Sequence, residues 1–338
     1  MFRAAVLGHP IGHSLSPVLH NAAYRALGLD DWEYSAVDVT SEQLGTFLDQ
    51  EAGTWAGFSL TMPLKVEVLK WLSHQSSSYK IDQLSKDVGA ANTLVLGSEL
   101  AAYNTDVYGI VAAIREVIRH GPVESIAILG AGATAASALA AAKKLGADKV
   151  EIYARSESAR SQMLETAKRL GFVTPQFGSF SPHHANSAPR QVVPGQPFNR
   201  DAWIGEVFGS GPRCWALDYN DILANPTKLS EYDAVISTLP AHAADPIATH
   251  LVELTKPSVE EGGTPVSKPP VNIRGALLDV VYDPYPSELM ATWSALGGAV
   301  VGGERMLLHQ ASKQVELMTG HPAPIVAMET ALNQALNK

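Results

Sequence analysis

One short stretch constrains the fold of this chain more than any other. It follows an apolar run at 125–129, typical of a buried strand, and it leads into a helical pattern and a second strand at 149–154. The stretch consists of Gly130, Ala131, Gly132, Ala133, Thr134 and Ala135. This is the G-x-G-x-x-A form of the dinucleotide-binding loop, in the strand–turn–helix–strand context that the loop requires. The segment therefore predicts a parallel sheet covered by helices, with a dinucleotide at the loop.

The residues after the second strand indicate which dinucleotide is bound. NAD sites place an acidic residue there, which binds the ribose 2′-hydroxyl. This chain has Arg155 and Ser156 instead, with Arg160 one turn further on. A guanidinium matches the geometry of a phosphate, so these residues favour NADP over NAD. A later strand in the region 232–240 is expected to end near the same cofactor, at Thr238.

The residues before this unit alternate between strand and helix patterns. Apolar runs near 4–7, 32–39 and 55–60 read as strands, and amphipathic segments follow each of them. Such an alternation predicts a mainly parallel sheet covered by helices. The break at 120–122, His-Gly-Pro, is the expected boundary between this part and the dinucleotide-binding part.

A lysine stands where the third of these strands turns into a helix. The segment 57–65 reads Gly-Phe-Ser-Leu-Thr-Met-Pro-Leu-Lys, and Pro63 suits the first helical position. Lys65 then lies in the first turn, where the helix dipole disfavours a cation. Simple solvation would account for an exposed lysine. A ligand that carries an anion or a carbonyl group would account for it more specifically.

Polar residues also gather at two other strand–helix junctions. Ser14 and Ser16 precede a helix, and Ser16 followed by Pro17 predicts that Ser16 caps it. Two hydroxyls at a helix N-terminus would equally suit a carboxylate. Asp106 opens another helix and is expected to be its N-cap, while Asn92 fits ordinary turn chemistry.

Bulk properties exclude several classes of protein. The net charge of −9 provides no basic footprint, so we expect no nucleic-acid partner, and the apolar runs are too short or too glycine-rich for a membrane helix. Cys214 is the single cysteine, which predicts a chain without internal disulfides in the reducing cytoplasm. The histidines are scattered, and His9 and His13 are separated by Pro10, so no metal site is expected.

Taken together, seven separated motifs resemble the shikimate dehydrogenase family over nearly the whole chain. The segment 13–17 is similar to the family's H-S-x-S-P, and 57–65 to its G-x-N-V-T-x-P-x-K. The others are A-N-T at 91–93, N-T-D at 104–106, the loop 130–135, D-V-V-Y-D-P at 279–284 and G-E-R-M-L-L-H-Q at 303–310. The resemblance implies an NADP-dependent dehydrogenase that interconverts 3-dehydroshikimate and shikimate in aromatic amino acid biosynthesis, without a metal.

The resemblance also implies a role for each matched position. Lys65 and Asp106 would be the catalytic pair. The substrate would be held by Ser14, Ser16, Ser59, Thr61, Asn92, Tyr282 and Gln310. Met306 would lie near substrate and nicotinamide, with the loop 130–135, Arg155, Ser156, Arg160 and Thr238 on the cofactor. The implied fold is a substrate domain over 1–106, completed by helices at 303–338, a connecting helix at 107–120 and a Rossmann domain over 121–302.

Two departures keep alternatives open, one at Ser59 and one at 154–156, where Ala-Arg-Ser stands in place of the family's common N-R-T. Ser59 stands where the family motif has asparagine, and a hydroxyl is shorter with fewer donors than an amide. A quinate/shikimate dehydrogenase that uses NAD in catabolism is therefore a second hypothesis, and a non-catalytic shikimate-binding sensor is a third. The sequence leaves open whether the chain is a monomer or a homodimer. It also assigns no role to two long polar loops, at 171–213 and around 256–273.

Overall fold

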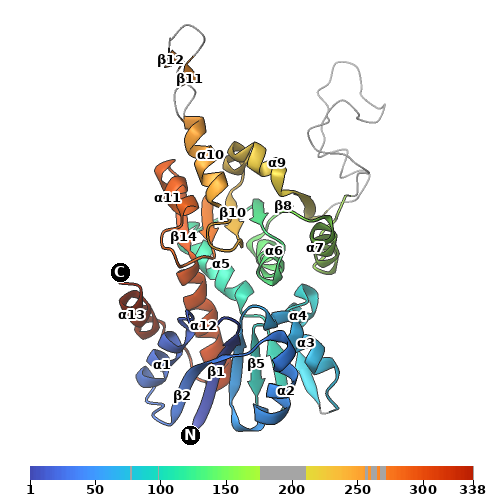
Figure 1. The fold of residues 1–338 in the computed structure, drawn as a ribbon, viewed down its shortest axis with the longest axis vertical. Coiled ribbons are helices and arrows are strands. Elements are labelled where there is room, and N and C mark those ends of the chain that lie inside the picture. Colours follow the sequence, from blue (N-terminus) through green and yellow to red (C-terminus); the bar gives the residue numbers. More distant parts are fainter. Residues whose placement is uncertain are drawn as a thin grey trace.

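The computed structural model describes residues 1–76, 78–97, 99–175, 211–255, 258–259, 265–266 and 272–337. These residues form two six-stranded sheets, each flanked by helices (Figure 1). The first sheet takes its strands from the N-terminal part of the chain, and the second from the middle and C-terminal parts. The loop expected at 171–213 lies outside the described residues except at its ends, as does most of the loop around 256–273.

The first sheet has the strand order β2-β1-β3-β5-β6-β4. Its strands are β1 (Phe2–Gly8), β2 (Trp32–Asp38), β3 (Gly57–Leu60), β4 (Tyr79–Ile81), β5 (Thr93–Leu96) and β6 (Leu100–Tyr103). Only β5 runs antiparallel to its neighbours β3 and β6, so the mainly parallel sheet that the sequence predicts is confirmed. Parallel order places the carboxyl ends of β1, β2 and β3 at one edge.

Helices cover both faces of this sheet. One face packs against α2 and α3, and the other against α1 and the two C-terminal helices. The helices concerned are α1 (Ser16–Ala26), α2 (Ser41–Glu51), α3 (Leu64–Ser73), α12 (Gly303–Thr319) and α13 (Ile325–Ala335), with the short 3-10 helix η1 (Ala52–Thr54) after α2. Helix α4 (Gln83–Val88) lies beside β6 and packs against α6 and α7. The last two helices thus return the end of the chain to the first sheet (Figure 1).

The second sheet is parallel throughout, in the order β14-β13-β10-β7-β8-β9. Its strands are β7 (Ser125–Leu129), β8 (Lys149–Ala154), β9 (Arg213–Asp218), β10 (Ala234–Ser237), β13 (Ala276–Asp279) and β14 (Ala299–Gly302). Numbered within the sheet, the order is 3-2-1-4-5-6 from the β9 edge, which is that of a doubly wound dinucleotide-binding fold. Ligands of such folds bind at the carboxyl ends of the strands where the order reverses, here between β7 and β10.

Buried apolar side chains hold helices on both faces of this sheet. The helices are α5 (Asp106–Val117), α6 (Ala133–Leu145), α7 (Glu157–Arg169), α9 (Tyr219–Ala224), α10 (Asp245–Thr255) and α11 (Glu288–Ala295), with the 3-10 helix η3 (Pro226–Glu231); β11 (Ser258–Val259) and β12 (Pro265–Val266) form a separate small hairpin. Helices α5 and α12 pack against each other between the two sheets (Figure 1). No helix among the described residues is long and apolar enough to cross a membrane.

Candidate active site

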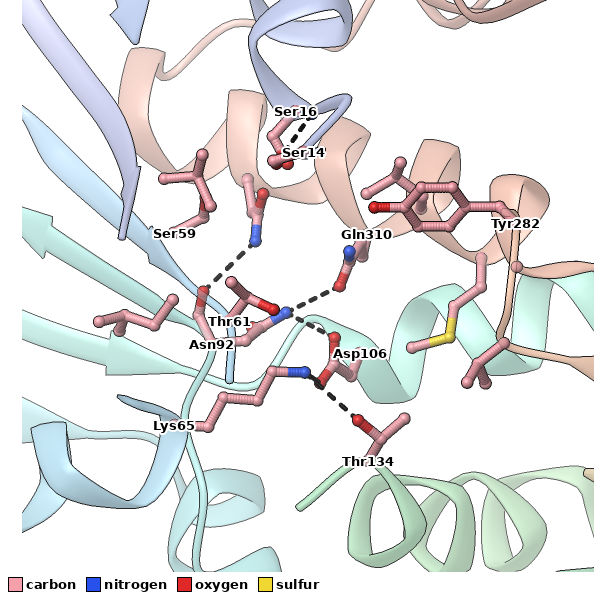
Figure 2. A pocket seen from close by; sticks show the side chains of 17 residues that line it. Ser14, Ser16, Ser59, Thr61, Lys65, Asn92, Asp106, Thr134, Tyr282 and Gln310 are labelled. Carbon is pink, nitrogen blue, oxygen red and sulfur yellow. Dashed lines mark hydrogen bonds and ion pairs between the residues drawn. The ribbon is translucent and has the colours of Figure 1, made fainter. Parts of the chain in front are cut away.

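A cavity of about 150 Å³ lies between the first sheet, α12 and the start of α6 (Figure 2). Its lining joins residues at or near strand ends of both sheets with residues from five helices, α1, α3, α5, α6 and α12. The lining residues are Val6, Ser14, Ser16, Ser59, Leu60, Thr61, Lys65, Asn92, Asp106, Thr134, Val280, Tyr282, Gly303, Met306, Leu307, Gln310 and Gln314. The cavity therefore brings together the catalytic pair and all seven substrate-binding residues that the sequence predicts, although they are up to 296 residues apart (310 − 14).

An ion pair lies at one end of this cavity. Lys65, in the first turn of α3, places its Nζ 2.6 Å from Oδ2 of Asp106, the first residue of α5. The Asp106 side chain is fully buried, and that of Lys65 is 13% exposed. The ammonium group also donates to Thr134 Oγ1 at 3.5 Å, on the first turn of α6. Lys65 thus lies between a fixed carboxylate and the dinucleotide-type loop.

Asn92 fixes the carboxylate from its other side. Its amide Nδ2 donates to Asp106 Oδ1 at 2.8 Å and to Gln310 Oε1 at 3.0 Å. Its Oδ1 accepts from the Thr105 N–H at 2.7 Å, which holds the amide in one orientation. Both oxygens of Asp106 therefore accept hydrogen bonds from groups that are themselves held, and charge-assisted bonds of this kind are strong.

The predictions that Ser16 and Asp106 are helix N-caps are wrong. Helix α1 begins at Ser16 itself, and the Ser16 N–H donates to Ser14 Oγ at 3.4 Å. Helix α5 begins at Asp106, and the capping acceptor there is Asn104 Oδ1, which receives the Val107 N–H at 3.3 Å. In each case a nearby polar residue, Ser14 or Asn104, accepts the N–H at the start of the helix. The side chains of Ser16 and Asp106 line the cavity instead. Pro63 likewise precedes α3 by one residue instead of opening it.

Four hydroxyl groups line the cavity, with those of Ser14 and Ser16 on the side away from the ion pair (Figure 2). Ser14 and Ser16 lie at the start of α1, Ser59 on β3 and Thr61 just after it. The Ser59 Oγ is hydrogen-bonded to the hydroxyl of Tyr34, a buried residue of β2. Several short hydroxyls around one space offer multiple hydrogen-bond donors without a fixed charge, an arrangement that suits a carboxylate on a small ligand.

Helix α12 forms one side of the cavity. Met306, Gln310 and Gln314 follow one another at four-residue spacing, so they lie on one face of the helix. Gln314 was not predicted, although this spacing from Gln310 is a signal that could have found it. Tyr282 lies across the cavity with its hydroxyl directed toward the Gln310 side (Figure 2). Burial raises the pKa of the Tyr282 phenol, so it is neutral and can donate a hydrogen bond.

The predicted dinucleotide loop has the backbone that such a loop needs. Gly130 has a φ of +112°, and a Cβ at this position would lie 2.5 Å from Thr238 Oγ1. Gly132 is the N-cap of α6, no side chain caps the helix, and a Cβ there would meet nothing within 4 Å. The first N–H groups of α6 are therefore open to an anion, and the helix dipole favours one. These residues fit the pyrophosphate of a dinucleotide.

The polar residues after β8 differ in the contacts that they make with the rest of the protein. Arg155 is exposed, with its guanidinium 5.3 Å from the ring centre of Tyr219. Ser156 caps α7 by accepting the Ala159 N–H at 3.2 Å. Arg160 forms an ion pair with Asp218 at 2.8 Å and also donates to the carbonyl of Ala154. Arg155 is thus the cation at this strand end that remains available to a phosphate, whereas Arg160 stiffens the turn.

Within the described ranges, no group of three or more His, Cys, Asp and Glu side chains could hold a metal ion. Cys214 is buried on β9, and burial raises its thiol pKa well above the usual range, which makes it unreactive. The cavity places the Lys65 ammonium group, which can transfer a proton, between the Asp106 carboxylate and the start of α6.

Two family models match the chain. The shikimate dehydrogenase substrate binding domain matches residues 6–94, and the shikimate 5′-dehydrogenase C-terminal domain matches residues 303–332. Among curated proteins, the shikimate dehydrogenase (NADP(+)) of Methanosarcina barkeri is 31% identical, with 98% of this chain and 97% of that protein covered. The shikimate dehydrogenase (NADP(+)) of Nitrosopumilus maritimus is 28% identical, with 97% of each chain covered.

Solved structures agree. A shikimate 5-dehydrogenase from Mycobacterium fortuitum is 31% identical, with a TM-score of 0.68 and coverage of 98% of this chain and 97% of that one. The shikimate dehydrogenase of Mycobacterium tuberculosis is 28% identical, with a TM-score of 0.71 and coverage of 99% and 100%. With the cavity, the parallel second sheet and the C-terminal helices in place, the chain belongs to the shikimate dehydrogenase family.

Proposed function

We propose that this protein catalyses the reversible reduction of 3-dehydroshikimate to shikimate with NADPH, in the biosynthesis of aromatic amino acids. One observation carries the proposal. The Lys65–Asp106 pair lies between a hydroxyl-rich end suited to a carboxylate and the loop suited to a dinucleotide, within a single small cavity. The NADP-dependent relatives named above, which match the chain over nearly its full length, support the same reaction.

The cofactor would be held by residues of the second sheet. The N–H groups at the start of α6, beside Gly130 and Gly132, would bind the pyrophosphate, and Arg155 with the Ser156 hydroxyl the 2′-phosphate of NADP. Arg160, Thr238 and Met306 would support this site from its edges. When bound, the nicotinamide supplies the hydride for the ketone carbon.

The residues of this chain would bind the substrate and move the proton. Ser14, Ser16, Ser59 and Thr61 would hold the carboxylate, away from the ion pair. Asn92 and Gln310 would orient the ring hydroxyls beside Asp106, with Tyr282 closing the opposite side.

Lys65 would act as the general acid. Its Nζ would donate a proton to the oxygen on C3 as the carbonyl becomes a hydroxyl, and would take it back in the reverse reaction. Asp106 would accept a hydrogen bond from that hydroxyl and hold the ammonium group in place, because its carboxylate is itself fixed by Asn92.

We further propose the division of the chain that the sequence suggests. Residues 1–106 with 303–338 would form the substrate domain, 107–120 the connecting helix and 121–302 the cofactor domain. The grouping of strands into two sheets supports this division. A small-molecule substrate, no nucleic-acid or membrane partner, a monomer or homodimer, and a cytoplasmic location complete the proposal.

Four reactions test the function, each followed by the absorbance of reduced nicotinamide. Shikimate and quinate are each offered with NADP⁺ and with NAD⁺. We expect turnover mainly with shikimate and NADP⁺. Faster turnover of quinate with NAD⁺ would refute the assignment in favour of a catabolic quinate enzyme, and binding of shikimate without turnover would indicate a sensor.

A variant then tests the role of Lys65. We expect Lys65→Met to lower kcat by about 10²–10⁴-fold, the range for loss of a proton-transfer group, with a smaller change in KM. Lys70→Ala is the matched control, because Lys70 lies on the same helix but is exposed and paired with Glu67. Near-normal kcat in Lys65→Met would refute the catalytic role.

A further inference from the structure

A buried cluster lies directly behind Ser59, outside the cavity. Its centre is Tyr34 on β2, whose hydroxyl is hydrogen-bonded to Ser59 Oγ on β3. Tyr34 pairs in register with Ala4 of β1, and Ser59 with Val6, so both side chains project from the same face of the sheet across β1. Tyr34 is 2% exposed and does not line the cavity, whereas Ser59 does.

Helix α1 holds Tyr34 from two sides. The ring of His20 stacks on the Tyr34 ring with centroids 3.9 Å apart and planes 14° apart. The next residue, Asn21, bonds the backbone of Tyr34 twice, accepting from its N–H at 3.0 Å and donating to its carbonyl at 2.8 Å. Since β2 is an edge strand, this amide does for Tyr34 what a neighbouring strand would do. The phenol therefore has little freedom to move.

The support for this arrangement extends to the other end of the cavity. His20 Nε2 lies 3.3 Å from Gln314 Oε1, and the Gln314 amide donates to Thr93 Oγ1 at 3.2 Å and to the carbonyl of Asn92 at 3.4 Å. Burial lowers the pKa of His20 to about 3, so the ring is neutral and Nε2–H donates to the glutamine oxygen. The cluster thus contributes no charge to the cavity.

The hydrogen-bond count fixes the direction of the Tyr34–Ser59 bond. A tyrosine hydroxyl has one hydrogen to donate, and among the described residues it contacts the acceptor Ser59 Oγ. If Ser59 were the donor, the buried phenol hydrogen would be left without a partner, which is costly. Burial also keeps this phenol protonated, since it raises the pKa of Tyr34 well above the usual range. Tyr34 is therefore the donor, and the Ser59 hydrogen remains for a ligand in the cavity.

We propose that Tyr34 is a positioning residue for substrate binding, which makes Ser59 a dedicated hydrogen-bond donor to an anionic oxygen in the cavity. The inference rests on the proposed function, in which that oxygen belongs to the substrate carboxylate. The inference accounts for Ser59 at a position where the family motif has asparagine. An asparagine amide carries two N–H donors of its own, whereas here Ser59, oriented by the Tyr34 hydroxyl, supplies the donor.

Tyr34→Phe tests the inference, with Tyr24→Phe as the matched control. Tyr24 belongs to the same cluster, its ring centre lies 6.5 Å from that of Tyr34, and its buried hydroxyl has no hydrogen-bond partner among the described residues. Each change removes one buried phenol oxygen. We expect Tyr34→Phe to raise KM for shikimate about tenfold with kcat within about twofold, because Ser59 is no longer held in the orientation that donates to the carboxylate, while the bonds from Ser14 and Ser16 remain. Tyr24→Phe should leave both constants unchanged.

A second variant separates positioning from simple packing. If Tyr34 acts through Ser59, then Tyr34→Phe combined with Ser59→Ala should bind shikimate no more weakly than Ser59→Ala alone. With the methyl ester of shikimate, which lacks the negative charge, Tyr34→Phe should change KM by less than about threefold. Unchanged KM for shikimate in Tyr34→Phe, additive effects in the double variant, or an equal loss with the ester would each overturn the proposal.

The proposed function and the role of Tyr34 can be refuted independently of each other. Lack of turnover by the wild-type protein would refute the dehydrogenase assignment. Calorimetric titration of shikimate into wild-type, Tyr34→Phe and Tyr24→Phe proteins would still decide the role of Tyr34, because it measures binding without chemistry. Weaker binding in Tyr34→Phe alone supports the role, and equal binding in all three refutes it.

Discussion

The ion pair between Lys65 and Asp106 makes a sharp prediction about stability as well as catalysis. Asp106 is fully buried, and Lys65 supplies the one positive charge in contact with it among the described residues. Lys65→Met keeps the length of the side chain but removes that charge. The Asp106 carboxylate then keeps only the Asn92 amide, at 2.8 Å on its other oxygen. A buried charge that loses its partner typically costs 3–5 kcal/mol.

The magnitude here should lie at the lower end of that range. The Lys65 end of the pair opens into the cavity, so water can occupy the space next to the carboxylate oxygen that loses its ammonium partner. We therefore expect Lys65→Met to lower the free energy of unfolding by about 3 kcal/mol. Asp106→Asn removes the buried charge and keeps a similar shape, so adding it to Lys65→Met should recover about 2 kcal/mol of that loss.

Thermal unfolding without substrate or cofactor measures this cycle, with Lys70→Ala as the exposed control. At about 2.1 cal/mol/K of unfolding entropy per residue, about 3 kcal/mol corresponds to a fall in Tm of roughly 4 °C for a chain of 338 residues. The double variant should unfold at a higher temperature than Lys65→Met although it lacks one more native group, and it should remain inactive. A double variant whose loss equals the sum of the two single losses would refute the reasoning, because it would mean that the two charges do not stabilise each other in the folded protein.

Two further predictions concern the cofactor domain. Arg155→Ala should raise KM for NADP⁺ about tenfold or more while changing KM for NAD⁺ little, since only NADP carries the 2′-phosphate; parallel changes for both nucleotides would contradict the role of Arg155. Glu151 is buried among Lys149, Lys228 and Tyr232, and despite the opposing effect of burial these partners lower its pKa to about 2, from an ordinary 4.5. Its stabilising contribution is complete above pH 4.5 and is lost as the pH falls toward 2, by about 3 kcal/mol in all. Chemical unfolding at pH 6 and pH 3 should therefore show a larger loss for wild type than for Glu151→Gln, and equal losses would contradict it.

Several parts of the fold could be predicted because they depend on neighbouring residues alone. Gly130 and Gly132 placed the turn between β7 and α6, and the strand at 149–154 was confirmed to the residue as β8. Gly146 ended α6 in the left-handed conformation that glycine adopts without strain. Strand–helix alternation likewise predicted the mainly parallel first sheet. Such local preferences are expressed in the sequence within a few positions.

The helix N-termini show where local rules are insufficient. Ser16 and Asp106 have the residue types of good N-caps, yet each lies one position inside its helix. The difference of one residue is decided by which polar groups nearby can satisfy the first N–H groups, and Asn104 does so for α5. That choice matters for function, because the two Asp106 oxygens accept from Lys65 and Asn92, and the helix N–H is left to Asn104.

The sequence by itself determined the dinucleotide-type loop and the alternation of strands and helices, and through its motifs it predicted which residues line the cavity. Tertiary structure alone decided how those residues act on one another. Asn92 and Gln310 meet across 218 positions, and Tyr34 reaches Ser59 only because β2 and β3 flank β1 in the folded sheet. Hydrogen bonds between such distant residues depend on groups that only packing brings together, so they leave no periodic signal in the chain.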